Sequence, residues 1–311
     1  MNREFIIDVS RSIGTIDYAM VEKDAIIHRL LTEIASDEHL SDHLVFKGGT
    51  CLVKAHLSYY RFSDDIDFGW ADDRLWRDRS KRSTESSCLA EIKKIIERMT
   101  LIASRLELTF DPSISSHNDI FINNTGTKVT FHLHYEPTIS PSSGKIKMEV
   151  NLVDLILHQP SRMPLSSLLD RIDAKTRYIH HEDVLYYGGP VLMMSYTREE
   201  TLIEKCRAAM TRGQYKIRDT IDLAMLKRKF NLDIFDFEEE IEKKLRFTVG
   251  RFQRYREAFN DASLPEDPVE LERDMNLLIV PRPPNLMNDM VEINKHLNQL
   301  KNELSKKMKT I

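Results

Sequence analysis

The spacing of hydrophobic and polar positions divides the chain into helical and strand-forming stretches. Residues 3–36 carry apolar positions at helical spacing and predict two helices. Residues 44–70 predict a strand, a helix and a second strand, because an apolar run leads into Gly-Gly-Thr and then into an alternating segment. A polar loop over 71–87 then leads into a helix predicted over 88–104.

The middle of the chain, from residue 105 to residue 157, is predicted to consist mostly of strands. Polar and apolar side chains alternate there in three stretches separated by turn-rich sequence, namely 106–110, 129–135 and 146–152. Residues 158–190 show no single period and end in Tyr-Tyr-Gly-Gly-Pro, where we place a domain boundary. The pattern therefore predicts an α/β (α+β) domain over 1–190, with a mixed sheet and flanking helices.

Helical spacing returns after this boundary and predicts a helical domain over residues 191–311. Its first helix is expected to open with a capping box, in which the side chains of Thr197 and Glu200 each bind a backbone amide. The last helix carries a heptad seam formed by Leu286, Met290, Ile293, Leu297, Leu300 and Leu304. We expect this seam to pack on the helical domain. The alternative is that it docks to a partner protein.

Composition and charge are those of an ordinary globular protein with two domains. Hydrophobic residues make up 41% of the 311 residues and charged residues 30%, and the net charge is −4. This charge excludes a global basic field, so any contact with nucleic acid needs a local patch. The basic run of Arg77, Arg79, Lys81 and Arg82 is either such a patch or a solvated surface.

Features of the whole chain also predict where the protein works. No apolar run approaches the ~20 residues of a membrane span, and the N-terminus lacks the pattern of a signal peptide. Cys51, Cys88 and Cys206 show neither metal-ligand spacing nor a disulfide framework. We therefore expect a reduced, cytoplasmic protein without membrane contact.

The candidate chemistry lies between residues 44 and 70. The adjacent Gly48 and Gly49 allow backbone amides to approach a phosphate closely, and a helix beginning there would add its own N-terminal amides. Asp65 and Asp67 alternate along the next strand, so both carboxylates point to one face and favour a hard cation. A phosphate cradle beside such a pair suggests phosphoryl or nucleotidyl transfer. The structural alternatives are an ordinary Gly-Gly turn and a solvated strand edge.

Two segments of this stretch resemble the AbiEii/AbiGii family of nucleotidyltransferase-like toxins, which belong to type IV toxin–antitoxin and abortive-infection systems. They are Lys47-Gly48-Gly49-Thr50-x-Leu52 and Arg61-Phe62-Ser63-Asp64-Asp65-Ile66-Asp67-Phe68, in which Asp64 stands where the family usually has glutamate. The resemblance implies a nucleotidyltransferase-like fold of the polymerase-β superfamily, with a cleft that the helical domain completes. It implies transfer of NMP from an NTP to an acceptor with Mg²⁺ or Mn²⁺. It also implies a cognate antitoxin, and tRNA or another translation component as the acceptor.

The resemblance assigns roles to individual residues. Those implied in nucleotide binding are Lys47, Gly48, Gly49, Thr50, Arg61 and Arg218. The metal ligands implied are Asp65, Asp67 and, from a later strand, Glu149. Catalytic roles fall to Asp65, Asp67, Lys205 and Asp219, with Lys205 on the triphosphate and Asp222 orienting Asp219. In the helical domain the match consists of a Glu-Lys pair, a basic turn and Arg-Asp-x-x-Asp-Leu.

Structural alternatives exist for several of these positions. Glu149 is either a metal ligand or part of a plain exposed sheet face. Arg218 and Asp222 are four residues apart on one helix and would pair with each other if neither had a function. The segment Glu22-Lys23-Asp24 also resembles the family. We attribute its charges to the helix dipole, with a place for Lys23 near the active cleft as the alternative.

Other interpretations concern a histidine pair and the function as a whole. His132 and His134 share a strand face and are interpreted as structural or surface histidines, because no third ligand follows at a recognisable spacing. The alternative functions are an NTP-binding regulatory module without transfer activity and a protein-interaction factor that relies on the C-terminal seam.

Overall fold

The chain forms two compact units. The parts of it that the structure, a computed structural model, describes are residues 1–140, 143–272 and 277–309. The first unit consists of Met1–Asp154 and Pro160–Ser195, and the second of Leu155–Gln159 and Tyr196–Ile311. These units are compact parts of the structure, whereas the predicted boundary after residue 190 separates domains that would fold independently. That boundary stays a prediction.

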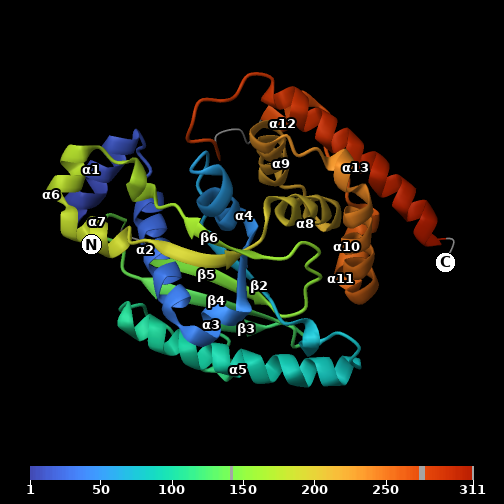
Figure 1. The fold of residues 1–311 in the computed structure, drawn as a ribbon, viewed down its shortest axis with the longest axis horizontal. Helices are drawn as coiled ribbons and strands as arrows, with labels where there is room; N and C mark the ends of the chain where they lie inside the picture. The colour runs from blue at the N-terminus through green and yellow to red at the C-terminus, as the bar shows by residue number, and fades with distance from the viewer. Residues whose placement is uncertain (141–142, 273–276, 310–311) are drawn as a thin grey trace. The chain divides into compact units, whose positions relative to one another are not determined.

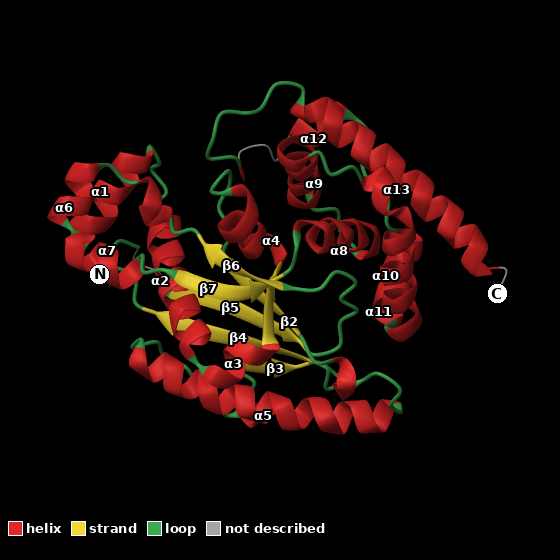
Figure 2. Cartoon of the chain, in the orientation of Figure 1, coloured by secondary structure: helices red, strands yellow, loops and turns green. Residues whose placement is uncertain are grey.

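The first unit contains a mixed sheet covered by helices (Figures 1 and 2). Its strands are β1 (Leu44–Lys47), β2 (Asp65–Trp70), β3 (Ile120–Ile122), β4 (Lys128–Tyr135), β5 (Gly144–Asn151), β6 (Ser161–Leu165) and β7 (Val191–Ser195). Its helices are α1 (Arg3–Ile13), α2 (Tyr18–Ser36), α3 (Glu38–His43), α4 (Gly48–Cys51), α5 (Lys81–Arg105), α6 (Ala174–Ile179) and α7 (His181–Tyr187). The predicted mixed sheet with flanking helices is confirmed.

The strands of the sheet follow the order β3-β4-β5-β2-β1-β7-β6. Strand β2 pairs antiparallel with β1 and parallel with β5. Alternation along the strands separates two faces, because successive side chains point to opposite sides. Ile66 and Phe68 of β2, Met148 of β5 and Phe131 of β4 are fully buried on one face. The other face of these central strands therefore carries the polar residues.

Two predictions in the first unit are wrong in detail. Helix α5 begins at Lys81 rather than at residue 88, because the side chain of Ser80 caps it and its polar first turns show no apolar period. Residues 106–110 form no strand. Only Thr109 bridges to His134, and the chain then turns away where the amide of Asp111 donates to Asp119 at 2.7 Å.

The second unit is built from helices, as predicted (Figure 2). They are α8 (Arg198–Thr211), α9 (Ile217–Phe230), α10 (Glu238–Arg251), α11 (Gln253–Asp261), α12 (Pro268–Glu272) and α13 (Leu286–Lys309). The six apolar residues of the predicted seam are buried, and α13 packs against α8, α9 and α12. The seam therefore belongs to the core of this unit, and the alternative of a partner-docking seam is wrong. In the described part of the chain, no helix is long and apolar enough to cross a membrane.

Candidate active site

A row of polar side chains crosses the first unit's sheet on the face opposite its apolar core. The register places Lys47 of β1 directly beside Asp67 of β2, and Asp67 directly beside Glu149 of β5. Asp65, two residues before Asp67, lies beside Lys147 in the same way. Because directly paired residues share a face, the two predicted aspartates and Glu149 converge on one surface.

Asp65 and Asp67 differ from Glu149 in the same row because their side chains have no partner within the described part of the chain. Among the described residues, no hydrogen bond or ion pair involves the side-chain oxygens of either aspartate. Burial and the neighbouring charge of Glu149 raise the pKa of Asp67, although Lys47 opposes this shift. Two half-buried carboxylates that repel each other are a fitting place for a cation.

Glu149 lies beside the aspartates but is already neutralised. Its two carboxylate oxygens contact the ammonium of Lys147 at 2.8 Å and that of Lys128 at 3.2 Å. Burial opposes ionisation of Glu149, but these two lysines hold its pKa below the ordinary value. Neither lysine was predicted as part of the site. Lys147 shares the face of Glu149 by alternation along β5, whereas Lys128 reaches Glu149 from β4 through a pairing between strands that spacing along the chain does not reveal.

The two glycines are required by the close packing of α4 on the acidic strand. Gly48 has a φ of +79°, and a Cβ atom there would overlap the carboxylate of Asp67. A Cβ atom on Gly49 would lie only 2.7 Å from the Nη2 atom of Arg61. The Gly-Gly pair therefore brings the backbone at the start of α4 against the carboxylate pair, which is the arrangement expected of a phosphate cradle.

Other residues predicted to bind nucleotide have side chains that contact the protein itself. The hydroxyl of Thr50 lies 2.9 Å from that of Ser63 and also contacts the carbonyl of Asp65. Arg61 is buried and donates to the carbonyl of Phe62 at 2.8 Å. The contact of Thr50 with Asp65 ties the glycine segment to the acidic strand, whereas the contact of Arg61 with Phe62 is local.

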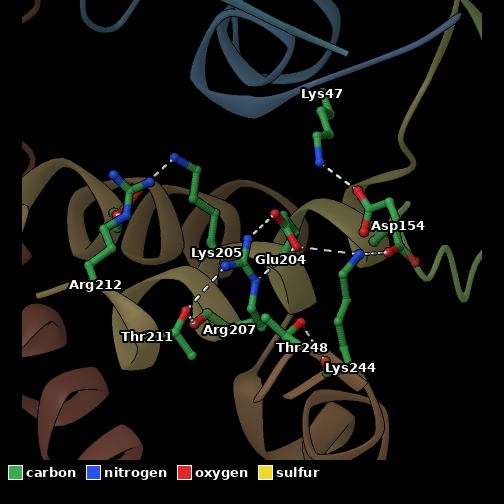
Figure 3. A network of polar contacts seen from close by, with 11 residues as sticks. Lys47, Asp154, Glu204, Lys205, Arg207, Thr211, Arg212, Lys244 and Thr248 are labelled. Atoms are coloured by element: carbon green, nitrogen blue, oxygen red, sulfur yellow. Dashed lines mark hydrogen bonds and ion pairs between the residues drawn. The ribbon is translucent and has the colours of Figure 1, made fainter. Parts of the chain in front are cut away.

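Lys47 is likewise engaged by the protein. Its ammonium lies 2.5 Å from Asp154, and both side chains are nearly buried (Figure 3). Asp154 was not predicted as part of the site. No pattern in the sequence distinguishes it, because it follows β5 and meets Lys47 only through the fold.

A second buried network lies behind the glycine segment and includes a π-helix at Leu52–Leu57. The Lys54 ammonium contacts Asp24 at 2.9 Å and the Tyr59 hydroxyl at 2.5 Å, and this hydroxyl donates to Asp24. The helix-dipole explanation of residues 22–24 is wrong, because α2 begins at Tyr18 and is capped by Asp17. These charges are therefore tertiary contacts, and Lys23 reaches the acidic segment through Asp64, at 3.2 Å.

In the second unit the predicted residues Lys205, Asp219 and Asp222 form one buried cluster. The Lys205 ammonium lies 2.9 Å from Asp219 and 2.6 Å from Asp222, while Arg212 lies 3.0 Å from Asp219 (Figure 3 labels both basic residues). Two carboxylates thus face two cations, and the charges balance. Arg218 does not make the alternative ion pair with Asp222, whose carboxylate binds Lys205 instead.

The predicted capping box of α8 is only half formed. Thr197 accepts a hydrogen bond from the amide of Glu200, as predicted. The side chain of Glu200 is fully buried and accepts hydrogen bonds from the amides of Leu157 and His158 and from Lys244 instead. Lys244 also reaches Glu204 at 3.4 Å (Figure 3). The buried ammonium of Lys244 needs a carboxylate partner, and this interaction takes precedence over the local cap at Glu200.

The residues present can hold a cation only together with ligands from outside the protein. Within the described ranges, no three His, Cys, Asp or Glu side chains are arranged to hold a metal ion by themselves. Mg²⁺, however, is commonly held by one or two carboxylates that substrate phosphates and water supplement. Asp65 and Asp67 meet that description. His132 and His134 do not contribute, since His132 packs on Phe121 and His134 contacts Asp119 at 2.9 Å.

Comparisons with known proteins complete the description of the site. A search of curated proteins gave no match. JHP933 from Helicobacter pylori is similar in structure with a TM-score of 0.42 and 15% identity, over 94% of this chain and 96% of the other. A candidate nucleotidyltransferase from H. pylori is similar in structure with a TM-score of 0.41 and 15% identity, over 91% of this chain and 95% of the other. The family model described as "Nucleotidyl transferase AbiEii toxin, Type IV TA system" matches residues 29–302. The chain therefore belongs to the AbiEii family of nucleotidyltransferase toxins.

Proposed function

We propose that this toxin transfers NMP from an NTP to an acceptor hydroxyl, with Mg²⁺ or Mn²⁺ held by Asp65 and Asp67. The observation that carries the proposal is a pair of carboxylates on β2 that have no partner among the described residues, with Asp67 packed directly against Gly48. In the reaction, the acceptor hydroxyl releases its proton to solvent as its oxygen forms a bond to the α-phosphorus, the α–β anhydride bond breaks, and pyrophosphate leaves. A bound divalent ion would activate the hydroxyl and neutralise charge on the phosphates.

The chain's own residues supply orientation and charge. The strand pleat fixes Asp65 and Asp67 on one face, so their geometry is set before any ligand binds. Gly48 and Gly49 allow the phosphates to approach the backbone next to Asp67. We keep Glu149 as a third ligand candidate. A cation there would have to compete with Lys147 and Lys128 for its oxygens.

Parts of the proposal come from family membership. The type IV toxin–antitoxin family supports a cognate antitoxin as partner. An RNA acceptor such as tRNA and a cytoplasmic setting are proposed in addition. Nucleotide-related roles for Lys47, Thr50, Arg61 and Arg218, and for Lys205 with Asp219, remain predictions. The contacts of Lys205 support a structural role at least as well, because its ammonium already binds two buried carboxylates.

The test is incubation of purified protein with Mg²⁺, each α-labelled NTP in turn, and total RNA. The variant is the double Asp65→Ala, Asp67→Ala. The matched control is the double Asp72→Ala, Asp73→Ala, which removes two carboxylates just beyond the same strand. We expect label on an RNA band of tRNA size with wild type and control, and none with the Asp65/Asp67 variant.

The other outcomes separate the alternatives. Label on a protein band would keep the transferase proposal and reject the RNA acceptor. A metal-dependent rise in melting temperature with NTP, but no pyrophosphate release even in cell lysate, would favour the NTP-binding module. Growth arrest that persists in cells expressing the Asp65/Asp67 variant would refute a catalytic toxin.

A further inference from the structure

The polar face of the sheet continues well beyond the carboxylate pair, over strands β5, β4 and β3. Directly paired residues carry it outward from Asp67 to Glu149, then to Thr130 and finally to Phe121. A second row leads from Asp65 through Lys147 to His132. We call the outer part of this face the strand platform and define it by Phe121, Lys128, His132, Lys145 and Lys147.

The strand platform is positively charged in a chain whose net charge is −4. It carries three lysines, of which Lys128 and Lys147 form ion pairs with the single carboxylate of Glu149. Asp65 and Asp67 lie at its inner edge, where Asp65 is directly beside Lys147. At its outer side, Asp119 is buried and already accepts from His134 and from the amide of Asp111. The platform is therefore a local basic patch. An acidic protein needs such a patch to bind a polyanion.

At His132, burial and the charges of the patch act in the same direction. Burial and then the charge of Lys145 lower the pKa of His132, although Asp119 acts in the opposite direction. A neutral imidazole at physiological pH leaves an aromatic surface between lysines rather than an additional point charge.

The strand platform also presents an aromatic ring. Phe121 lies on the edge strand β3 and is 41% exposed. Its ring lies 5.1 Å from that of His132, at an interplanar angle of 56°. An exposed phenylalanine beside a histidine, on a sheet face that also carries three lysines, is an arrangement on which unpaired bases stack while their phosphates meet ammonium groups.

The order of the strands places the platform and the glycine segment on opposite sides of the carboxylate pair. The glycine segment follows β1, whereas the platform lies on β5, β4 and β3, and β2 lies between them. Three strand spacings of about 4.8 Å separate β2 from β3, so the platform extends about 14 Å from the aspartates. A donor phosphate beside Gly48 and an acceptor on the platform would thus approach the carboxylates from two sides.

We propose that the strand platform binds an unpaired RNA strand and leads its acceptor end to Asp65 and Asp67. The proposal rests on the proposed transferase function and identifies the face on which the acceptor binds. A base stacks on Phe121, and Lys145, Lys147 and Lys128 contact the backbone phosphates. Because stacking requires an exposed base, the platform is expected to prefer single-stranded over double-stranded RNA.

The test measures binding separately from transfer. Fluorescence anisotropy follows a labelled 12-nucleotide single strand of RNA, and the same strand in a duplex, with wild type, Phe121→Ala, Phe121→Tyr and Lys145→Ala. The controls are Tyr178→Ala and Lys175→Ala, which remove an exposed aromatic and an exposed lysine from α6 of the same unit. Thermal melting of every variant shows that the fold is retained.

We expect Phe121→Ala to weaken single-strand binding at least about fivefold, Phe121→Tyr to restore it, and duplex binding to change little. Lys145→Ala should reduce the slope of log Kd against log salt by about 0.7, the value for one phosphate contact of a single strand. Both controls should bind as wild type does.

The proposal would be overturned by an absence of single-strand binding at low salt, or by Phe121 and Lys145 variants that bind like the controls. Transfer of label to a protein band at an unchanged rate in Phe121→Ala would also overturn it. These results leave the transferase proposal standing. That proposal fails separately if no NTP donates label even though wild type binds RNA. The Asp65→Ala, Asp67→Ala variant should bind RNA and transfer nothing.

Discussion

Two clusters of acidic residues in this protein differ in how their charges are compensated. On β2, the carboxylates of Asp65 and Asp67 have no partner among the described residues. On α9, Asp219 and Asp222 are almost completely buried, and Lys205 contacts both. The first cluster keeps unbalanced negative charge on a half-buried face, and the second cancels its charge inside a helical core.

The difference indicates which cluster is available to a ligand. A buried ion pair whose charges balance needs nothing further, and removal of one member leaves an uncompensated charge that costs several kcal/mol. Buried carboxylates without partners are destabilising when charged, and burial, followed by the charges of Glu149 and Asp65, raises the pKa of Asp67 against the opposing effect of Lys47. A cation can relieve the first cluster but would have to break the second.

The largest expected effect is on catalysis at the first cluster. We expect Asp65→Asn with Asp67→Asn to lower the rate of nucleotide transfer about a thousandfold or more, because several kcal/mol of electrostatic stabilisation disappear. The melting temperature should rise or stay unchanged. A carboxyl with a raised pKa binds its proton more tightly in the folded state, so folding is less favourable when the group is charged at pH 7.

Single-turnover transfer assays and thermal melting of the same preparations test this prediction. The neighbouring variant Asp73→Asn, which changes an exposed residue of similar charge, should alter neither quantity appreciably. A strong drop in melting temperature for the Asp65/Asp67 variant would show that these carboxylates are structural, and the contrast between the clusters would disappear.

The next effect is on stability at the second cluster. Lys205→Met retains the volume of the side chain but removes the cation that contacts both buried carboxylates, while Arg212 still contacts Asp219. We expect the free energy of unfolding to fall by about 3–5 kcal/mol, measured by urea denaturation with Lys175→Met as the exposed control. Unchanged stability together with lost NTP binding would instead assign Lys205 to the triphosphate, as family resemblance predicts.

The sequence predicted the first cluster better than the second for a physical reason. Asp65 and Asp67 are two residues apart on one strand, and period-two geometry alone places them on one face. Gly48 and Gly49 are adjacent in the chain, and the positive φ of Gly48 is a local property, although the atoms that leave no room for a Cβ belong to Asp67 and Arg61. Features that depend on local geometry can be predicted from the order of residues.

Pairings between distant segments could not be predicted in this way. The contacts of Lys47 with Asp154 and of Lys54 with Asp24 span 107 and 30 positions, and depend on how strands and helices pack. The capping box at Glu200 does not form for the same reason, because the carboxylate of Glu200 binds the distant Lys244 instead. Residues 106–110 alternate like a strand, but the fold leaves them only one bridge, at Thr109.

A smaller effect isolates the contact between the glycine segment and the first cluster. Gly48 and Gly14 have similar positive φ angles, +79° and +76°, but only Gly48 faces another residue. Gly14→Ala should therefore cost about 1 kcal/mol from backbone strain alone. Gly48→Ala should cost more and also lower transfer activity, because its methyl group displaces Asp67. Equal losses of stability with normal activity would show that the approach of Gly48 to Asp67 has no functional importance.

The smallest effect we expect is stabilisation by the cation itself. At a free Mg²⁺ concentration ten times its dissociation constant, binding to the folded state contributes about 1.4 kcal/mol. Wild type should therefore melt at a higher temperature in MgCl₂ than in KCl of equal ionic strength, a comparison that removes general screening. The Asp65→Asn, Asp67→Asn variant should start at or above the wild-type melting temperature and show no such difference. Asp219→Asn should start lower, because it disrupts a balanced cluster, and still respond to Mg²⁺. If the responses of the two variants were reversed, the cation would bind at the helical cluster, and the unpartnered carboxylates of β2 would need another explanation.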